Sequence, residues 1–481
     1  MGRIGHLDLT SLRDQLQREV ASLYSFVEAV SHACSPPPQA VSYSESSSKF
    51  FSQISLLAEH TKKHLVDFEN HAEDNDEDFV ESRTELWTLR TAWRELHQFI
   101  KPSADADTLN QPTAIIAALV NRLRELRGFE STDFTIFHTD SFDYAQVNPR
   151  ATEDLVAQLA RIVDAAPFPT DLGLIGIPNS QGSALFLNCL LAHEIGEYVY
   201  AKRDIEAILA TNATAALERH IGEKFTGAPL ILQSRMTNTV AQCAKEIFCD
   251  LFAVRLIGPC YSFAYIELFD LPNLLSKDGT LIVGENAKPP ILMYRAYPSH
   301  PFRVKAQADL LKAEGWWDLI KDLDSRQCEV LRVMLELNTD AFIEAENRAG
   351  GESTPFVKAL IDVLPEVKNQ VGNVTNGIDP RLHEYSILWK PIAEYLSNGI
   401  VPSTLNVAGT DGTLREVHAT PITLLNASYR FYLEGVEKLM SRIKDQDLSS
   451  AQSRATWMRR IENWTAKALE DVTLLRSSGH E

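Results

Sequence analysis

The chain has 481 residues, of which 44% are hydrophobic and 23% are charged, and its formal net charge is −19. These fractions are those of an ordinary globular protein and exclude a disordered chain, while the length predicts two or three domains. The negative charge argues against a nucleic-acid partner or an anionic membrane surface, because phosphate groups are bound by basic patches.

The cysteines and the apolar runs carry expectations about the cellular compartment. The six cysteines are irregularly spaced and form no Cys-x-x-Cys pair, which argues against a thiolate zinc site or a redox motif. Cys189, Cys243 and Cys249 lie in apolar segments, where a free cysteine behaves as a small hydrophobic residue. No apolar run has the length of a signal peptide at the start of the chain or of a membrane span elsewhere. We therefore expect a cytoplasmic protein with no membrane contact.

Helical periodicity dominates the first part of the chain. Apolar residues recur every three or four positions, and Gly128 marks the end of the last helical segment. The helices expected here cover residues 9–33, 47–69, 79–100 and 112–127. We predict that residues 1–130 form an antiparallel helical bundle.

The pattern changes in the centre of the chain, which we treat as a separate region over residues 131–315. It begins with a short predicted strand at Leu172–Pro178. The helices expected after this strand are one that carries His193, one from about Ser234 to Ile257, and one that opens at residues 297–303. Beyond this region the pattern is again mostly helical, with an interruption near residues 401–421. It predicts a C-terminal helical region over residues 316–481.

Two of the central helices carry acidic side chains in apolar surroundings. The first contains His193-Glu194-Ile195-Gly196-Glu197, and the second contains Glu246-Ile247-Phe248-Cys249-Asp250. Burying a carboxylate without a partner costs several kcal/mol, and neighbouring like charges increase that cost. A cation is therefore expected among these four carboxylates, and a divalent metal is the simplest one.

The spacing of these residues suggests a role for each of them. Residues four positions apart lie on one face of a helix, so His193 and Glu197 can bind one ion together. Glu246 is suited to be the third ligand, and Asp250 can accept the free ring N–H of His193 and orient the ring. Glu194 would lie beside the ion and take a proton from water that the metal acidifies.

The motifs resemble those of gluzincin metallopeptidases. In one branch of that family His-Glu-x-x-His is followed by Glu-x-x-x-Asp and then by His-Pro with an arginine downstream. The matching segments here are His193-Glu194-x-x-Glu197, Glu246-x-x-x-Asp250 and His300-Pro301-Phe302-Arg303. The resemblance covers roughly residues 170–310 and leaves the helical flanks unexplained.

The resemblance implies a mainly α protein with a zincin-like α+β core, a small sheet plus an active-site helix, between helical N- and C-terminal regions. It implies hydrolysis of a peptide or protein substrate by a zinc enzyme. The metal would be held by His193, Glu197 and Glu246, and Glu194 would be the general base. His300 and Arg303 would lie near the metal as donors to the transition state or to the ligands.

The chain departs from the family at one ligand, because Glu197 stands where the family has its second histidine. One histidine and two carboxylates form a harder and more anionic set of ligands, which shifts the preference from zinc towards Mn²⁺, Fe²⁺ or Mg²⁺. The same change is also expected in a relative that has lost activity and kept the fold.

An alternative to the metal site therefore remains open. Arg255, Arg295, Arg303 or Lys245 would neutralise the carboxylates in a structural ion network without a metal. The corresponding function is a catalytically inactive scaffold that acts as a protein-interaction module. The intact Glu194 favours an enzyme, whereas the altered Glu197 favours the scaffold.

Overall fold

The protein is mainly helical, as the sequence predicts. A computed structural model describes residues 9–34, 45–71, 78–104, 110–139, 144–147, 149–166, 172–178, 184–269, 297–348, 351, 354–408, 413–442 and 451–477. The chain folds into two compact units. Unit 1 contains residues 1–109 and 132–179, and unit 2 contains residues 110–131 and 180–481.

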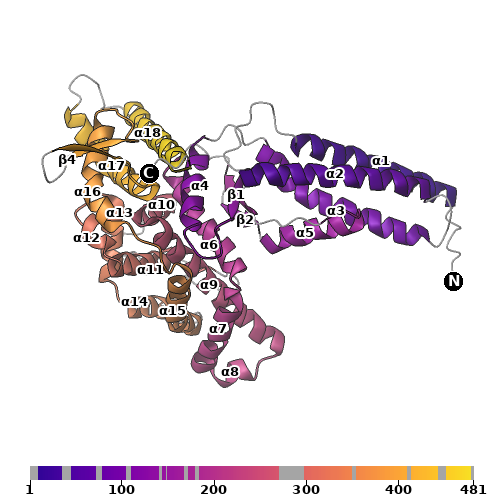
Figure 1. Ribbon diagram of the computed structural model, residues 1–481. Helices are drawn as coiled ribbons and strands as arrows, with labels where there is room; N and C mark the ends of the chain where they lie inside the picture. The colour runs from indigo at the N-terminus through magenta and orange to yellow at the C-terminus, as the bar shows by residue number, and fades with distance from the viewer. Residues whose placement is uncertain are drawn as a thin grey trace. The chain divides into compact units, whose positions relative to one another are not determined.

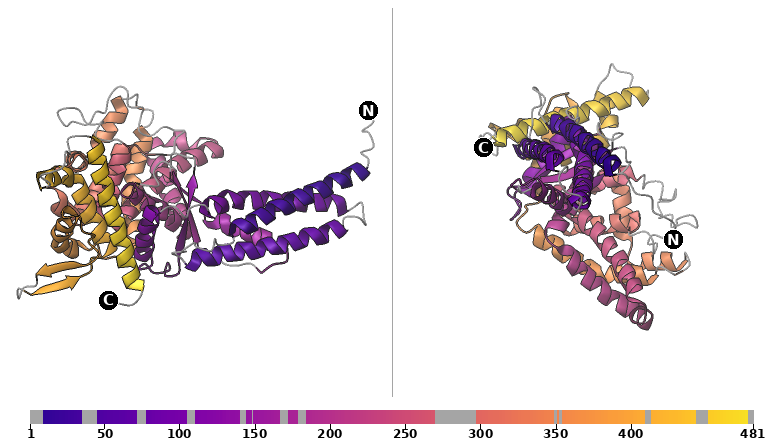
Figure 2. Two further views of the ribbon diagram at one scale, coloured as in Figure 1. Left: turned by 90° about the horizontal axis from the view of Figure 1, so that it is seen from above. Right: turned by 90° about the vertical axis from the view of Figure 1, so that its right-hand side faces the viewer.

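Unit 1 combines long helices with a small sheet. Its helices are α1 (Leu9–Cys34), α2 (Glu45–His71), α3 (Asp78–Ala104) and α5 (Pro149–Ile162). Helices α1, α2 and α3 run side by side (Figures 1 and 2). Apolar residues at helical spacing in α3, among them Leu89 and Trp93, are buried in their shared core. Helices therefore form in this part of the chain where the periodicity predicts them.

The sheet of unit 1 has three strands in the order β1-β3-β2. They are β1 (Asp133–Thr139), β2 (Ala145–Val147) and β3 (Leu172–Pro178), and β3 pairs parallel with β1 and antiparallel with β2. A Cβ at Gly173 would lie 2.2 Å from the ring of Phe134, so glycine is needed where this ring crosses the strand. The strand predicted at Leu172–Pro178 is β3.

In the part that the structure describes, the secondary structure of unit 2 is helical apart from a hairpin of β4 (Leu405–Ala408) and β5 (Leu414–Val417). Its helices up to residue 268 are α4 (Asn110–Leu123), the 3-10 turn η2 (Leu187–Leu190), α6 (Leu191–Lys202), α7 (Ile205–Ile221), α8 (Glu223–Thr226), α9 (Leu230–Ile257) and α10 (Pro259–Leu268). The later ones are α11 (His300–Ala313), α12 (Trp316–Ile320), α13 (Arg326–Glu336), α14 (Asp340–Arg348), α15 (Thr354–Val374), α16 (Leu382–Ser397), α17 (Pro421–Arg442) and α18 (Ala451–Ser477). The hairpin falls in the interruption expected near residues 401–421.

The central helix of unit 2 is α9, against which α6, α7, α11 and α15 pack. Its second half is almost completely buried. Gly258 ends it with a φ of +74°, and Pro259 opens α10 directly afterwards. None of the described helices combines the length and the apolarity that crossing a membrane requires.

The two units divide the chain differently from the three predicted regions. Helix α4, expected in the N-terminal bundle, packs against α18 and α9 and belongs to unit 2. The small sheet and α6, expected together in one core, belong to different units. The reason is that periodicity reports which face of a helix is apolar, but not which distant segment covers that face.

Candidate metal centre

Four helices of unit 2 bring the predicted site residues together. Helix α6 carries His193, Glu194 and Glu197, α9 carries Lys245, Glu246, Cys249 and Asp250, α10 carries Tyr261 and Tyr265, and α11 carries His300 and Arg303. The start of α11 is set locally, because the Ser299 hydroxyl accepts a hydrogen bond from the backbone N–H of Phe302 at 3.3 Å. Pro301 in the first turn reinforces this start and places Arg303 in the first turn of the helix.

Asp250 is the fully buried centre of a hydrogen-bond network. Arg303 donates to both of its carboxylate oxygens, from Nε at 2.6 Å and from Nη2 at 2.7 Å. The Tyr261 hydroxyl donates to Oδ1 at 2.5 Å. Burial alone would raise the pKa of Asp250, but the charge and hydrogen bonds of Arg303 hold it below its ordinary value. Asp250 is therefore an ionised acceptor.

His193 is oriented by this carboxylate. Its Nδ1 lies 2.9 Å from Asp250 Oδ1, so Nδ1–H is the donor and Nε2 is the atom available to a ligand. The sequence analysis expected this pair. Burial would lower the pKa of His193, but the hydrogen bond to Asp250 and the negative charge of Glu246 raise it to about 10. Without a bound cation the ring is thus protonated, and a metal must displace the proton on Nε2.

Glu246 contacts both His193 and Arg303. Its Oε2 lies 3.4 Å from His193 Nε2 and 3.3 Å from Arg303 Nη1, and the residue is buried. Burial would raise the pKa of Glu246, but the charges of His193 and Arg303 lower it below its ordinary value. Glu246 is therefore an ionised carboxylate whose negative charge is shared between a histidine and an arginine.

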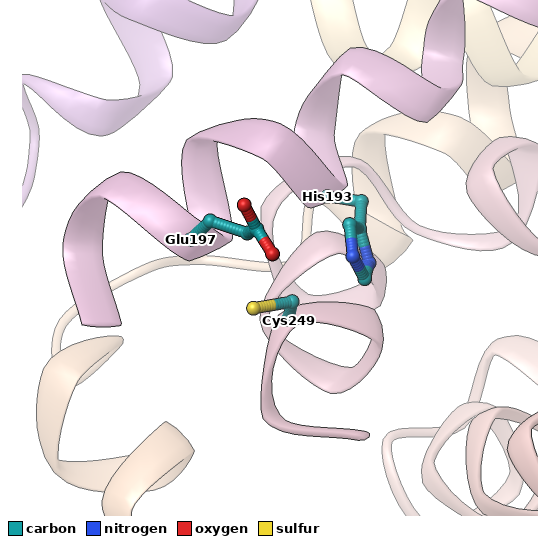
Figure 3. Close-up of side chains that lie close together, drawn as sticks. All are labelled: His193, Glu197 and Cys249. Carbon is teal, nitrogen blue, oxygen red and sulfur yellow. The ribbon is translucent and has the colours of Figure 1, made fainter. Parts of the chain in front are cut away.

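Glu197 and Cys249 also lie close to His193. Candidate donor atoms of His193, Glu197 and Cys249 all lie within 4.8 Å of one another, and among the described residues these three form the only such group. Figure 3 shows a carboxylate oxygen of Glu197 directed towards the other two side chains. Glu197 also pairs with Lys245, whose Nζ lies 2.6 Å from Oε1.

Glu194 is 7% exposed and lies in the same electrostatic environment. Burial raises its pKa to about 7; the charge of His193 opposes this rise, and the charge of Glu197 adds to it. Glu194 therefore exchanges a proton near neutral pH, which is the property of an effective general base.

His300 is connected to the network through Tyr265. The Tyr265 hydroxyl lies 2.7 Å from His300 Nδ1, and the Arg303 guanidinium lies 5.0 Å from the centre of the Tyr265 ring. Burial, together with the charge of Arg303, lowers the pKa of His300 to about 4, so the ring is neutral at neutral pH. Burial also raises the pKa of Tyr265, which keeps its hydroxyl protonated. Tyr265 thus donates to Nδ1, and Nε2–H of His300 remains a donor.

Only some of the cations that could neutralise these carboxylates contact them. Arg303 and Lys245 contact the carboxylates, whereas Arg255 pairs with Glu314. Arg295 lies outside the described residues. Two permanent cations and a protonated His193 therefore offset three of the four carboxylates. The fourth, Glu194, is ionised only in part near neutral pH, because burial raises its pKa to about 7.

Cys249, Tyr261 and Tyr265 are parts of this cluster that the motifs do not predict. The apolar surroundings of Cys249 predict only a small hydrophobic residue, although it lies three positions after Glu246 and so on the same face of α9. Tyr261 and Tyr265 are four positions apart in α10, a spacing that places both hydroxyls on one side of the helix. The spacing of Cys249 from Glu246 and of Tyr265 from Tyr261 is the sequence feature that could have indicated these residues.

Comparison with protein-family models, with curated proteins and with solved structures finds no match to this chain. The resemblance to gluzincins therefore rests on the sequence motifs alone.

Gly196 determines how closely α6 approaches α9. A Cβ at this position would lie 3.0 Å from the Cα of Cys249, a backbone atom that cannot rotate away. We expect Gly196→Ala to separate the helices and lower the free energy of unfolding by about 1–3 kcal/mol, measured by urea denaturation.

The matched control is Gly372→Ala in α15, where nothing lies within 4 Å of the added methyl group. Alanine there should be neutral or stabilising, by up to about 1 kcal/mol. If Gly196→Ala and Gly372→Ala have the same free energy of unfolding, then α6 and α9 can move apart without loss of stability.

Proposed function

We propose that the protein is a metal-dependent hydrolase whose cation is held between α6 and α9. The observation that carries this proposal is a buried, anionic group of donor atoms around a histidine whose ring is oriented by Asp250. Ionised carboxylates are costly in a protein interior, and a divalent cation bound to them offsets that cost. Peptide bonds are the proposed substrate because of the resemblance to gluzincins.

The residues present fit a divalent cation. His193 Nε2 and Glu197 are the donors from α6, and α9 offers Glu246 or Cys249 as the third. Two donor atoms bound tetrahedrally at about 2.1 Å lie about 3.4 Å apart. The distance from His193 Nε2 to Glu246 Oε2 is 3.4 Å, which is long for a hydrogen bond but fits this arrangement. A bound cation would act as a Lewis acid towards a carbonyl group and towards water.

The surrounding residues supply the remaining functions. Glu194 accepts the proton of the attacking water and returns it to the leaving amine, which its pKa near neutrality allows. His300 offers a neutral Nε2–H to the negative oxygen of the transition state, held in this tautomer by Tyr265. Arg303 keeps Asp250 ionised, and Asp250 in turn keeps His193 Nε2 directed at the site.

A second candidate function is a non-catalytic scaffold, and one observation favours it. Lys245 and Arg303 already form ion pairs with Glu197, Glu246 and Asp250, and a protonated His193 adds a third positive charge. A network of this kind can hold α6, α9 and α11 together without a metal. The protein would then act through its surfaces rather than through this cluster.

Metal content and chelator sensitivity separate the two functions. We expect the purified protein to contain about one equivalent of a divalent metal, and EDTA to lower its melting temperature, because bound metal stabilises only the folded state. At a metal concentration of 100 times Kd this stabilisation is about 2.7 kcal/mol. Glu197→Ala should melt at a lower temperature and no longer respond to EDTA.

The control is Glu329→Ala, which removes an exposed partner of Arg326 and should keep the full response to EDTA. A native protein without stoichiometric metal and with an EDTA-insensitive melting temperature would contradict the enzyme proposal and support the scaffold.

A further inference from the structure

Cys249 projects from α9 where this helix lies close to Gly196 of α6. Gly196 shares a face of α6 with His193, because it lies three residues after it. The missing side chain of Gly196 lets the backbone of Cys249 approach this face, as a Cβ there would lie 3.2 Å from the Cβ of Cys249. The Cys249 Sγ therefore lies within 4.8 Å of a donor atom of His193 and of Glu197.

Glu246, the other donor of α9, is already engaged. Its Oε2 contacts Arg303 at 3.3 Å, and Arg303 cannot withdraw because it is 7% exposed and bonded to both oxygens of Asp250. A divalent cation bound to Glu246 would therefore lie beside a fixed positive charge. Lys245, which pairs with Glu197, has a side chain that is 23% exposed and flexible, so it can turn into solvent when Glu197 binds a cation.

From these contacts we infer that the third ligand of the cation is the thiolate of Cys249 and that Glu246 remains paired with Arg303. The inference rests on the proposed metal site and specifies its ligands. The thiol releases its proton to solvent as the bond to the cation forms. One histidine, one carboxylate and one thiolate form a softer set than one histidine and two carboxylates, so the site selects Zn²⁺ over Mn²⁺ and Mg²⁺. Three protein ligands leave one position open for water.

Cobalt substitution tests this inference, because a thiolate bound to Co²⁺ produces a charge-transfer absorption in the near ultraviolet that oxygen and nitrogen ligands do not. We expect the metal-free protein loaded with one equivalent of Co²⁺ to show this absorption. Glu246→Gln should retain it, and Cys249→Ser should lose it. Cys243→Ser is the matched control, since Cys243 is buried on the same helix but lies outside the donor group, and it should retain the absorption.

The outcomes distinguish this inference from the proposed function. Stoichiometric cobalt binding without the absorption would overturn the thiolate ligand and leave a metal site in place. Failure of the wild-type protein to bind cobalt or zinc would overturn both proposals. If Cys249→Ser does not fold, X-ray absorption of the zinc-loaded wild-type protein decides the question. We expect a sulfur scatterer at about 2.3 Å, and its absence would contradict the inference.

Discussion

Glu194→Gln is expected to abolish hydrolysis while leaving the metal content and the melting temperature nearly unchanged. The loss of a general base lowers the turnover rate by about 10²- to 10⁴-fold. Glutamine has the shape of a protonated glutamate, and Glu194 is partly protonated near neutral pH because burial raises its pKa to about 7. The substitution therefore introduces no new desolvation cost, and the donors to the metal remain in place.

The measurement is turnover of a peptide substrate identified by screening a peptide library, together with metal analysis and thermal melting of the same samples. Glu206→Gln, at an exposed position at the start of α7, is the matched control and should retain full activity. Activity of Glu194→Gln that remains close to wild type would mean that another group accepts the proton.

Arg303→Met is expected to cause the largest loss of stability. The substitution keeps an apolar chain of similar length but leaves Asp250, which is fully buried, without the cation that donates to both of its oxygens. Removing one partner of a buried ion pair costs about 3–5 kcal/mol. We expect a decrease of this size in the free energy of unfolding, measured by urea denaturation.

Two further variants show whether this loss comes from the ion pair. Arg326→Met removes an arginine that is 53% exposed and pairs with Glu329, and it should change stability by less than about 0.5 kcal/mol. Asp250→Asn combined with Arg303→Met should cost less than the sum of the two single changes, by about 1–3 kcal/mol, because the unpaired charge is removed. Additive losses would mean that Arg303 stabilises the protein through packing alone.

The sequence by itself determined the features that depend on local spacing. Helical periodicity predicts the long helices, and the apolar run at Leu172–Pro178 predicts β3. The order of Ser299 and Pro301 predicts where α11 begins. The spacing of His193 and Glu197 places both on one face of α6. These features depend on residues within a few positions of one another, so no knowledge of the fold is needed.

Only the tertiary structure decided which residues from different helices meet. It selects Arg303 and Lys245 as counter-charges of the carboxylates and places Arg255 against Glu314 instead. It brings Cys249 to the donors of α6 because Gly196 permits a close helix contact. The physical reason is that contacts between helices depend on their relative rotation and separation, which side-chain volumes at the interface set. A pattern read along one helix contains no information about the surface of the helix that packs against it.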